Sequence, residues 1–235
     1  MSGPDQHLSV FWFQFYFLFY FFLSLRHAGL HSIISSGYVG KDFVLLQPLV
    51  AYRSLRQILK EPVLVCEGKL SLALDTASAL AFLHAREIYH LHLTSEHVLV
   101  TPDRKGLLQD YGVLQNMDPQ EVTEILLGEG NLGYLRPGSS RLPFRGSEVD
   151  TYSLGIIIGE MVLERPPVTK SYTGGRPTFL SQAILAPATD TDPFSIRSQL
   201  LAISRECLRE TSSPTAFDIK AHLEAILSDE DLDEV

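Results

Sequence analysis

The stretch that decides the fold runs from Ile88 to Val100, reads IYHLHLTSEHVLV, and is followed by Gln109-Asp110-Tyr111-Gly112. Val98–Val100 and Leu107-Leu108 flank the turn-forming residues 102–106, a pattern that predicts two short strands joined by a turn. A loop rich in histidine therefore leads into a small strand pair, and an acidic residue and a glycine follow it.

The sequence around this stretch predicts a mainly helical body. Residues 69–86 carry apolar side chains at helical spacing, and residues 152–163 are apolar on nearly every side, as in a helix buried inside a large domain. Strands are expected at 33–34 and 42–46, and residues 119–142 are expected to form a glycine-rich loop. Further helices are expected at residues 54–59, 179–185, 195–209 and 216–227. This order of elements predicts an α+β fold.

From about residue 25 to residue 227 the chain resembles a protein kinase that begins partway through the small lobe. His90 is similar to the first residue of the H-R-D motif, and Asp110-Tyr111-Gly112 is similar to D-F-G. Residues 134–138 fall at the A-P-E position, and residues 150–155 are similar to the start of the buried central helix. Residues 207–215 are similar to a late stretch near the end of the fold. No single motif is specific, but their order predicts a kinase-like fold.

The residues that should perform the chemistry are exchanged. In the pattern H-R-D-x-x-x-x-N, the Asp accepts the proton of the substrate hydroxyl and the Asn holds magnesium. Leu91 occupies the Arg position, His92 the Asp position and His97 the Asn position. The resemblance therefore implies a pseudokinase in which His90, Leu91, His92 and His97 are degenerate catalytic-loop positions.

Two acidic residues of the pattern are kept. Asp110 is either a weak metal-loop ligand or a turn residue before Gly112. The resemblance implies that Asp150 is structural, because in kinases this Asp accepts backbone N–H groups of the catalytic loop. Gly112 is also assigned a structural role.

The parts of a kinase that hold ATP are not found in the sequence before residue 26. That segment contains one glycine, Gly3, and no lysine, so the glycine-rich loop and the strand-borne Lys have no counterpart there. Pro48 falls in the hinge and lacks an N–H group. We therefore expect no cofactor, and neither ATP nor magnesium binding.

A buried ion pair of kinases is expected to be missing. The resemblance places Gly138 and Ser213 where the family has the Glu of A-P-E and its Arg partner. Losing both partners of a buried pair can be nearly neutral, whereas losing one costs about 3–5 kcal/mol. This double loss predicts a folded large lobe whose activation segment no longer needs an anchored geometry.

A transition-metal site is a more speculative interpretation of the same cleft. The resemblance implies that His92, His97 and Asp110 converge there, and two imidazoles with one carboxylate suit zinc, copper, nickel or iron. The alternative is three unrelated polar residues around an empty groove.

The first 25 residues form a separate segment in this interpretation. Residues 8–25 are uncharged and mostly aromatic, and as a helix they would span ~27 Å, close to a bilayer core of ~30 Å. The alternatives are a membrane anchor, an anomalous N-terminus and a plain core element. With Arg26 after the run, an anchor would leave the rest of the chain in the cytoplasm.

The predicted domain organisation follows from these points. Residues 1–25 are the aromatic segment, 26–228 the kinase-like domain (partial small lobe 26–50, large lobe 51–228) and 229–235 an acidic, frayed tail. A net charge of −9 argues against nucleic-acid binding, and two cysteines without metal spacing fit a reducing compartment.

We expect the chain to act in signalling as a non-catalytic module that binds or scaffolds a protein partner and has no enzymatic activity. Its expected location is the cytoplasm, or a membrane with the kinase-like domain facing the cytoplasm. The alternatives are a kinase with residual activity and a fragment of a longer kinase-like protein.

Overall fold

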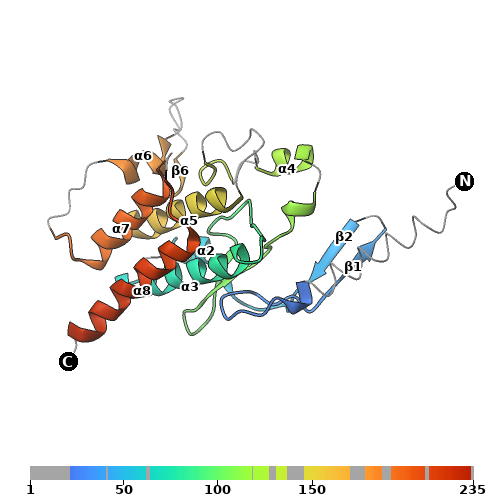
Figure 1. Ribbon diagram of the computed structural model, residues 1–235, viewed down its shortest axis with the longest axis horizontal. Helices are drawn as coiled ribbons and strands as arrows, with labels where there is room; N and C mark the ends of the chain where they lie inside the picture. Colours follow the sequence, from blue (N-terminus) through green and yellow to red (C-terminus); the bar gives the residue numbers. More distant parts are fainter. Residues whose placement is uncertain are drawn as a thin grey trace, which may run out of the picture.

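The structure is a computed structural model that describes residues 22–40, 42–61, 64–117, 119–126, 131–136, 146–169, 178–186, 192–209 and 212–233. Within this part of the chain, a body of helices carries three small antiparallel sheets. The helical body lies on one side of Figure 1, and the hairpin of β1 and β2 projects from it. The α+β expectation is therefore confirmed.

Four long helices build the core. These are α3 (Cys66–His84), α5 (Gly146–Leu163), α7 (Ile196–Cys207) and α8 (Ala216–Asp233). The most extensive helix contacts are those of α5 with α7 and of α3 with α8 (Figure 1). From Val149 to Val162 every residue of α5 is buried, so its apolar sequence reflects a helix enclosed on all sides.

Two glycines allow α5 to sit close to its neighbours. A Cβ atom on Gly155 would clash with Cys207 of α7, and one on Gly159 would clash with Ile184. Ile184 lies on α6 (Leu180–Leu185), so glycine at these two positions sets the packing distance between three helices.

The strands are short. They are β1 (Ser35–Val39), β2 (Asp42–Leu46), β3 (Arg53–Ser54), β4 (Val98–Val100), β5 (Gly106–Leu108), β6 (Val168–Thr169) and β7 (Thr178–Phe179). β1 pairs with β2, β6 pairs with β7, and β4 lies between β3 and β5. The pair β4–β5 flanks the turn that the sequence predicted.

Several boundaries differ from expectation. The first strand begins at Ser35, after Ile33, which belongs to the core. A helix, α4 (Pro119–Leu126), occupies the start of the expected loop, because Pro119 is well suited to a first helical turn. The acidic residues up to Asp233 continue α8, so the expected fraying is wrong for residues 229–233.

Two short helical pieces complete the description: α2 (Leu55–Ile58) and the 3₁₀ turn η1 (Leu114–Asn116). α2 has only four residues, but a capping box fixes its start. The Ser54 hydroxyl accepts the Gln57 N–H, and the Gln57 side chain accepts the Ser54 N–H.

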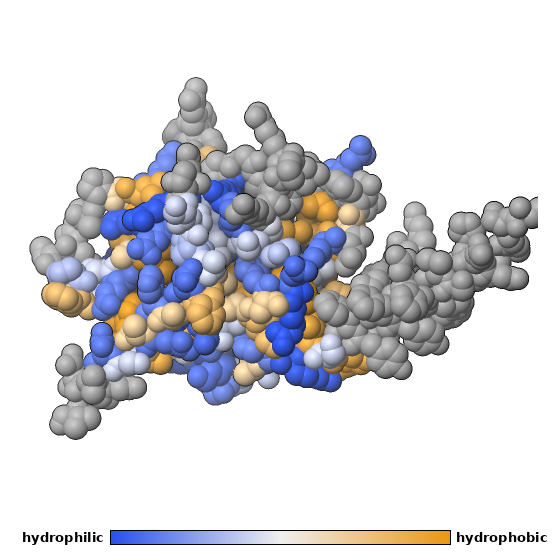
Figure 2. All heavy atoms as spheres, in the orientation of Figure 1, coloured by the Kyte–Doolittle hydropathy of each residue, from blue (hydrophilic) through white to orange (hydrophobic). Residues whose placement is uncertain are grey.

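The aromatic run reaches into the described part at its last residues. Phe22 and Leu25 are buried members of the main core, so the core includes the end of the 1–25 segment. The rest of the run, residues 8–21, lies outside the described residues. Among the residues that are described, no helix is long and apolar enough to span a bilayer. Polar side chains cover much of the face of the helical body shown in Figure 2.

Candidate functional site: a clasped loop with three packed histidines

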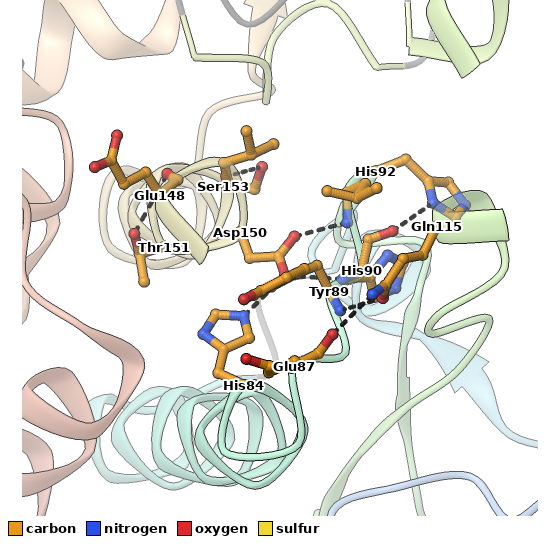
Figure 3. Close-up of polar contacts among 12 residues, drawn as sticks. His84, Glu87, Tyr89, His90, His92, Gln115, Glu148, Asp150, Thr151 and Ser153 are labelled. Atoms are coloured by element: carbon orange, nitrogen blue, oxygen red, sulfur yellow. Dashed lines mark hydrogen bonds and ion pairs between the residues drawn. The ribbon is translucent and has the colours of Figure 1, made fainter. Parts of the chain in front are cut away.

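The histidine-rich loop connects the end of α3 with β4, and a carboxylate from α5 holds its start. Asp150 is fully buried; its Oδ1 accepts the Leu91 N–H at 2.7 Å, and its Oδ2 accepts the His90 N–H at 2.8 Å. The His84 Nε2 atom of α3 also lies 2.9 Å from Oδ2 (Figure 3). These two backbone contacts are the ones that the resemblance implies for Asp150.

This clasp keeps an unusual backbone in place. Leu91 has a φ of 69° and Asp110 a φ of 58°, both in the left-handed region that non-glycine residues rarely adopt. Such a residue costs about 1–3 kcal/mol and persists only where the surroundings impose it. At Leu91 the hydrogen bond to Asp150 supplies that constraint.

Three imidazole rings pack against one another in this loop. The ring centroids of His92 and His97 are 4.4 Å apart, those of His90 and His92 are 4.8 Å apart, and those of His90 and His97 are 5.1 Å apart. Two of the rings contact backbone carbonyl oxygens, which only accept hydrogen bonds, so the contacting ring nitrogen of each must carry the proton. His90 Nε2 donates to Gln109 O, and His92 Nδ1 donates to His90 O.

Burial keeps these rings neutral. Loss of solvent lowers the pKa of His90 well below its ordinary value, lowers that of His92, and lowers the pKa of His97 to about 3. Mutual repulsion between protonated rings adds to the effect at His90 and His97. Neutral imidazoles thus stand where a kinase has an anionic Asp and an amide.

Asp110 lies beside this cluster, close to the rings of His92 and His31. Burial raises the pKa of its carboxyl, and the nearby rings of His92 and His31 lower it by a smaller amount. Among the described residues, no group of three His, Cys, Asp or Glu side chains is arranged to hold a metal ion. The transition-metal interpretation of His92, His97 and Asp110 therefore finds no support in this geometry.

The two residues after Asp110 are part of the core. Tyr111 is fully buried, and its hydroxyl donates to the His31 carbonyl at 3.1 Å. Gly112 has a φ of 72°, and a Cβ there would press on Ile88 and Phe22. The structural role assigned to Gly112 thus has two physical causes, the backbone conformation and the lack of space.

A second buried network was missed by the sequence reasoning. Glu160 of α5 is 3% exposed, pairs with Arg56 of α2, and accepts the Tyr134 hydroxyl at 2.6 Å. The Tyr134 hydroxyl also lies 2.8 Å from the Ser95 hydroxyl in the histidine-rich loop. Burial and Glu160 both raise the pKa of Tyr134, so the phenol stays protonated.

This network corrects one expectation about the activation segment. Gly138 lies outside the described residues, and Ser213 donates to the Arg209 carbonyl at 2.9 Å. The described residues 131–136 are nevertheless anchored, because Tyr134 is buried and bound to Glu160. A glutamate within the mostly apolar residues 152–163 was the available signal, since fully buried Glu is rare unless it is paired.

The comparisons with known proteins agree with this arrangement. The family model described as protein kinase domain matches residues 19–222. The chain therefore belongs to the protein kinase family.

Two relatives illustrate the range of similar sequences. The LEAF RUST 10 disease-resistance locus receptor-like protein kinase-like 1.1 of Arabidopsis thaliana is 27% identical over 180 residues, which is 69% of this chain and 28% of that protein. Serine/threonine-protein kinase PAK 4 of Mus musculus is 30% identical over 143 residues, 60% of this chain and 24% of that protein. The chain thus spans less than a third of the length of these relatives.

Proposed function

We propose that this chain is a pseudokinase: a member of the protein kinase family that serves as a non-catalytic protein-binding or scaffolding module in signalling. One observation carries the proposal. The Asp150 carboxylate holds the backbone of the histidine-rich loop, and His92 and His97, which the resemblance assigns to the positions of the proton acceptor and the magnesium ligand, lie in a buried, neutral cluster.

The chemistry of phosphoryl transfer supports this proposal. The reaction depends on positioning the phosphates of ATP and on neutralising their charge. Residues that bind magnesium and a cationic side chain perform these tasks. Magnesium is bound by oxygen ligands, and an imidazole has none. We therefore propose that ATP and magnesium are not bound productively here.

The partner proposed is a protein, reached in the cytoplasm or at the cytoplasmic side of a membrane. Two receptor-like relatives of Arabidopsis thaliana support membrane association as part of the proposal: the receptor-like protein kinase-like protein described above and the receptor-like protein kinase ANXUR1.

A phosphotransfer assay tests the proposal. Radiolabelled ATP with magnesium or manganese, incubated with the full chain and generic protein substrates, should give background incorporation. The double variant His92→Asp, His97→Asn is the matched comparison, because it restores the side chains of the family pattern. Incorporation by the wild-type chain that is abolished by His92→Ala would overturn the proposal.

One observation favours the second candidate, a kinase with residual activity. The Nδ1 proton of His92 is directed to the His90 carbonyl, so the neutral ring carries its lone pair on Nε2 and is able to accept a proton. A thermal-shift titration with ATP, with and without divalent ions, separates the candidates, because residual activity requires a nucleotide-dependent rise in melting temperature.

A further inference from the structure

The hairpin of β1 and β2 carries an apolar, exposed face. Its register pairs Ser35 with Leu46 and Gly37 with Val44. Because side chains alternate along a strand, these four residues and Val39 share one face of the hairpin. Val39 is 68% exposed and Leu46 is 54% exposed, and a Cβ atom on Gly37 would meet no described atom within 4 Å. This face is therefore open to a partner.

The opposite face of the hairpin is turned towards the helical body. Ser36 on that face is 6% exposed, and Leu45 packs against the main core. The hairpin projects from the body, with α8 towards the other end of the molecule (Figure 1). A two-stranded sheet is at best marginally stable alone in water, so an apolar surface against the open face would stabilise it.

The sequence around the hairpin carries no net charge. Between Arg26 and Arg53 the only charged residues are Lys41 and Asp42, whereas the whole chain has a net charge of −9. The cytoplasmic leaflet of a membrane is negatively charged and repels an acidic protein surface. The hairpin is therefore a part of the chain that can approach such a leaflet without repulsion.

The chain reaches the hairpin from the aromatic run. Phe22 belongs to the main core, so residues 8–21 are the uncharged stretch that remains available for a bilayer. As a helix these 14 residues would span ~21 Å, less than the ~30 Å of a hydrocarbon core. Trp12, Tyr16 and Tyr20 supply the amphipathic rings that favour the membrane interface. A run of this length inserts into one leaflet and, because Phe22 follows it directly, holds the body at the membrane surface.

We infer that the open face of the β1–β2 hairpin lies against the lipid surface into which residues 8–21 insert, with Val39 and Leu46 as its contact side chains. The inference rests on the membrane association proposed above and adds the orientation of the body: the hairpin faces the membrane, and α8 faces away from it.

Fluorescence quenching by labelled lipid tests this orientation. The full chain carries Cys66→Ser, and Cys207 is buried, so one introduced cysteine takes a nitrobenzoxadiazole label. The label is placed at Val39→Cys or at Phe217→Cys, and the protein is reconstituted in vesicles of phosphatidylcholine and phosphatidylserine with and without a nitroxide lipid. Phe217 lies on α8 and is 69% exposed, which matches Val39. Leu46→Cys and Leu185→Cys on α6 form a second matched pair, at 54% and 56% exposed.

The nitroxide lipid should quench the two hairpin labels at least about threefold more than the two control labels, because a contact face lies within ~5–10 Å of the boundary between headgroups and acyl chains. Trp12, the only tryptophan, reports insertion of the aromatic run in the same sample. Quenching of Trp12 with equal quenching at all four labels overturns the inference and leaves the membrane association standing. No quenching of Trp12 or of any label overturns both. Hairpin labels that are shielded from aqueous iodide but not quenched by the nitroxide lipid are covered by protein, such as a second copy of the chain, and this result also overturns the inference.

Discussion

Removing the Asp150 carboxylate should destabilise the protein far more than removing the Asp110 carboxylate. In Asp150→Ala, the His90 and Leu91 N–H groups and the His84 ring all lose their acceptor in a fully buried place. Each unsatisfied buried group costs about 1–3 kcal/mol. Relaxation of the left-handed Leu91 backbone returns part of this cost, so we expect a net loss of about 4 kcal/mol.

Asp110→Ala provides the comparison within the same cleft. Burial raises the pKa of this carboxyl, which means that the fold disfavours its charged form. Its removal should change the free energy of unfolding by about 1 kcal/mol or less, a cost that comes mainly from placing alanine in the left-handed conformation of this position.

Thermal and urea unfolding of the two variants measure the difference. At roughly 2–4 °C per kcal/mol for a domain of this size, Asp150→Ala should melt about 10 °C below Asp110→Ala. If Asp150→Ala does not fold, Asp150→Asn, which keeps one acceptor oxygen, should show an intermediate loss. Equal melting temperatures would refute the assignment of Asp150 as the residue that holds the loop.

Three further predictions concern other parts of the molecule. Burial lowers the pKa of His97 from the ordinary 6.5 to about 3, so the unfolded chain binds more protons than the folded chain between these two pH values. Urea titrations should therefore show the free energy of unfolding falling below pH 6.5, by up to about 1.4 kcal/mol per pH unit. His97→Gln should reduce this dependence on pH. Tyr134→Phe should cost about 1–2 kcal/mol, since it removes a hydrogen bond to the buried Glu160. The control Tyr52→Phe changes a half-buried tyrosine whose hydroxyl has no hydrogen bond within the described part of the chain, and it should cost less than about 0.5 kcal/mol. In cell fractionation, the full chain should sediment with membranes while a chain beginning at Phe22 stays in the supernatant; full chain found wholly in the supernatant would exclude the anchor.

The sequence predicts well those features that depend on local pattern. The buried helix α5, the strand pair β4–β5 and the position of Asp150 all follow from periodicity or from the order of motifs. The helix α4 was missed because the glycines further along residues 119–142 outweighed the favourable start at Pro119.

Contacts between distant segments could not be predicted in the same way. The link from Arg56 through Glu160 to Tyr134 joins three segments that are far apart in sequence, and none of the three lies in a motif position that the pattern marks as catalytic. The edge-to-face packing of His90, His92 and His97 also depends on how the loop folds back, which the spacing of these residues does not specify.

The residues that are kept and those that are exchanged differ in what their loss would cost the fold. Asp150 and Glu160 are buried acceptors, and removing either would leave donors or a cation such as Arg56 without a partner. His92 and His97 occupy positions whose family role is to contact nucleotide, metal or substrate rather than to support the fold. As neutral rings that pack together they carry no buried charge, so the fold tolerates them at little cost. Under the proposed function, a chain that binds a partner without transferring phosphate needs the fold-supporting carboxylate of Asp150 but does not need the family's side chains at the positions of His92 and His97. The stability difference between Asp150→Ala and Asp110→Ala measures that distinction directly.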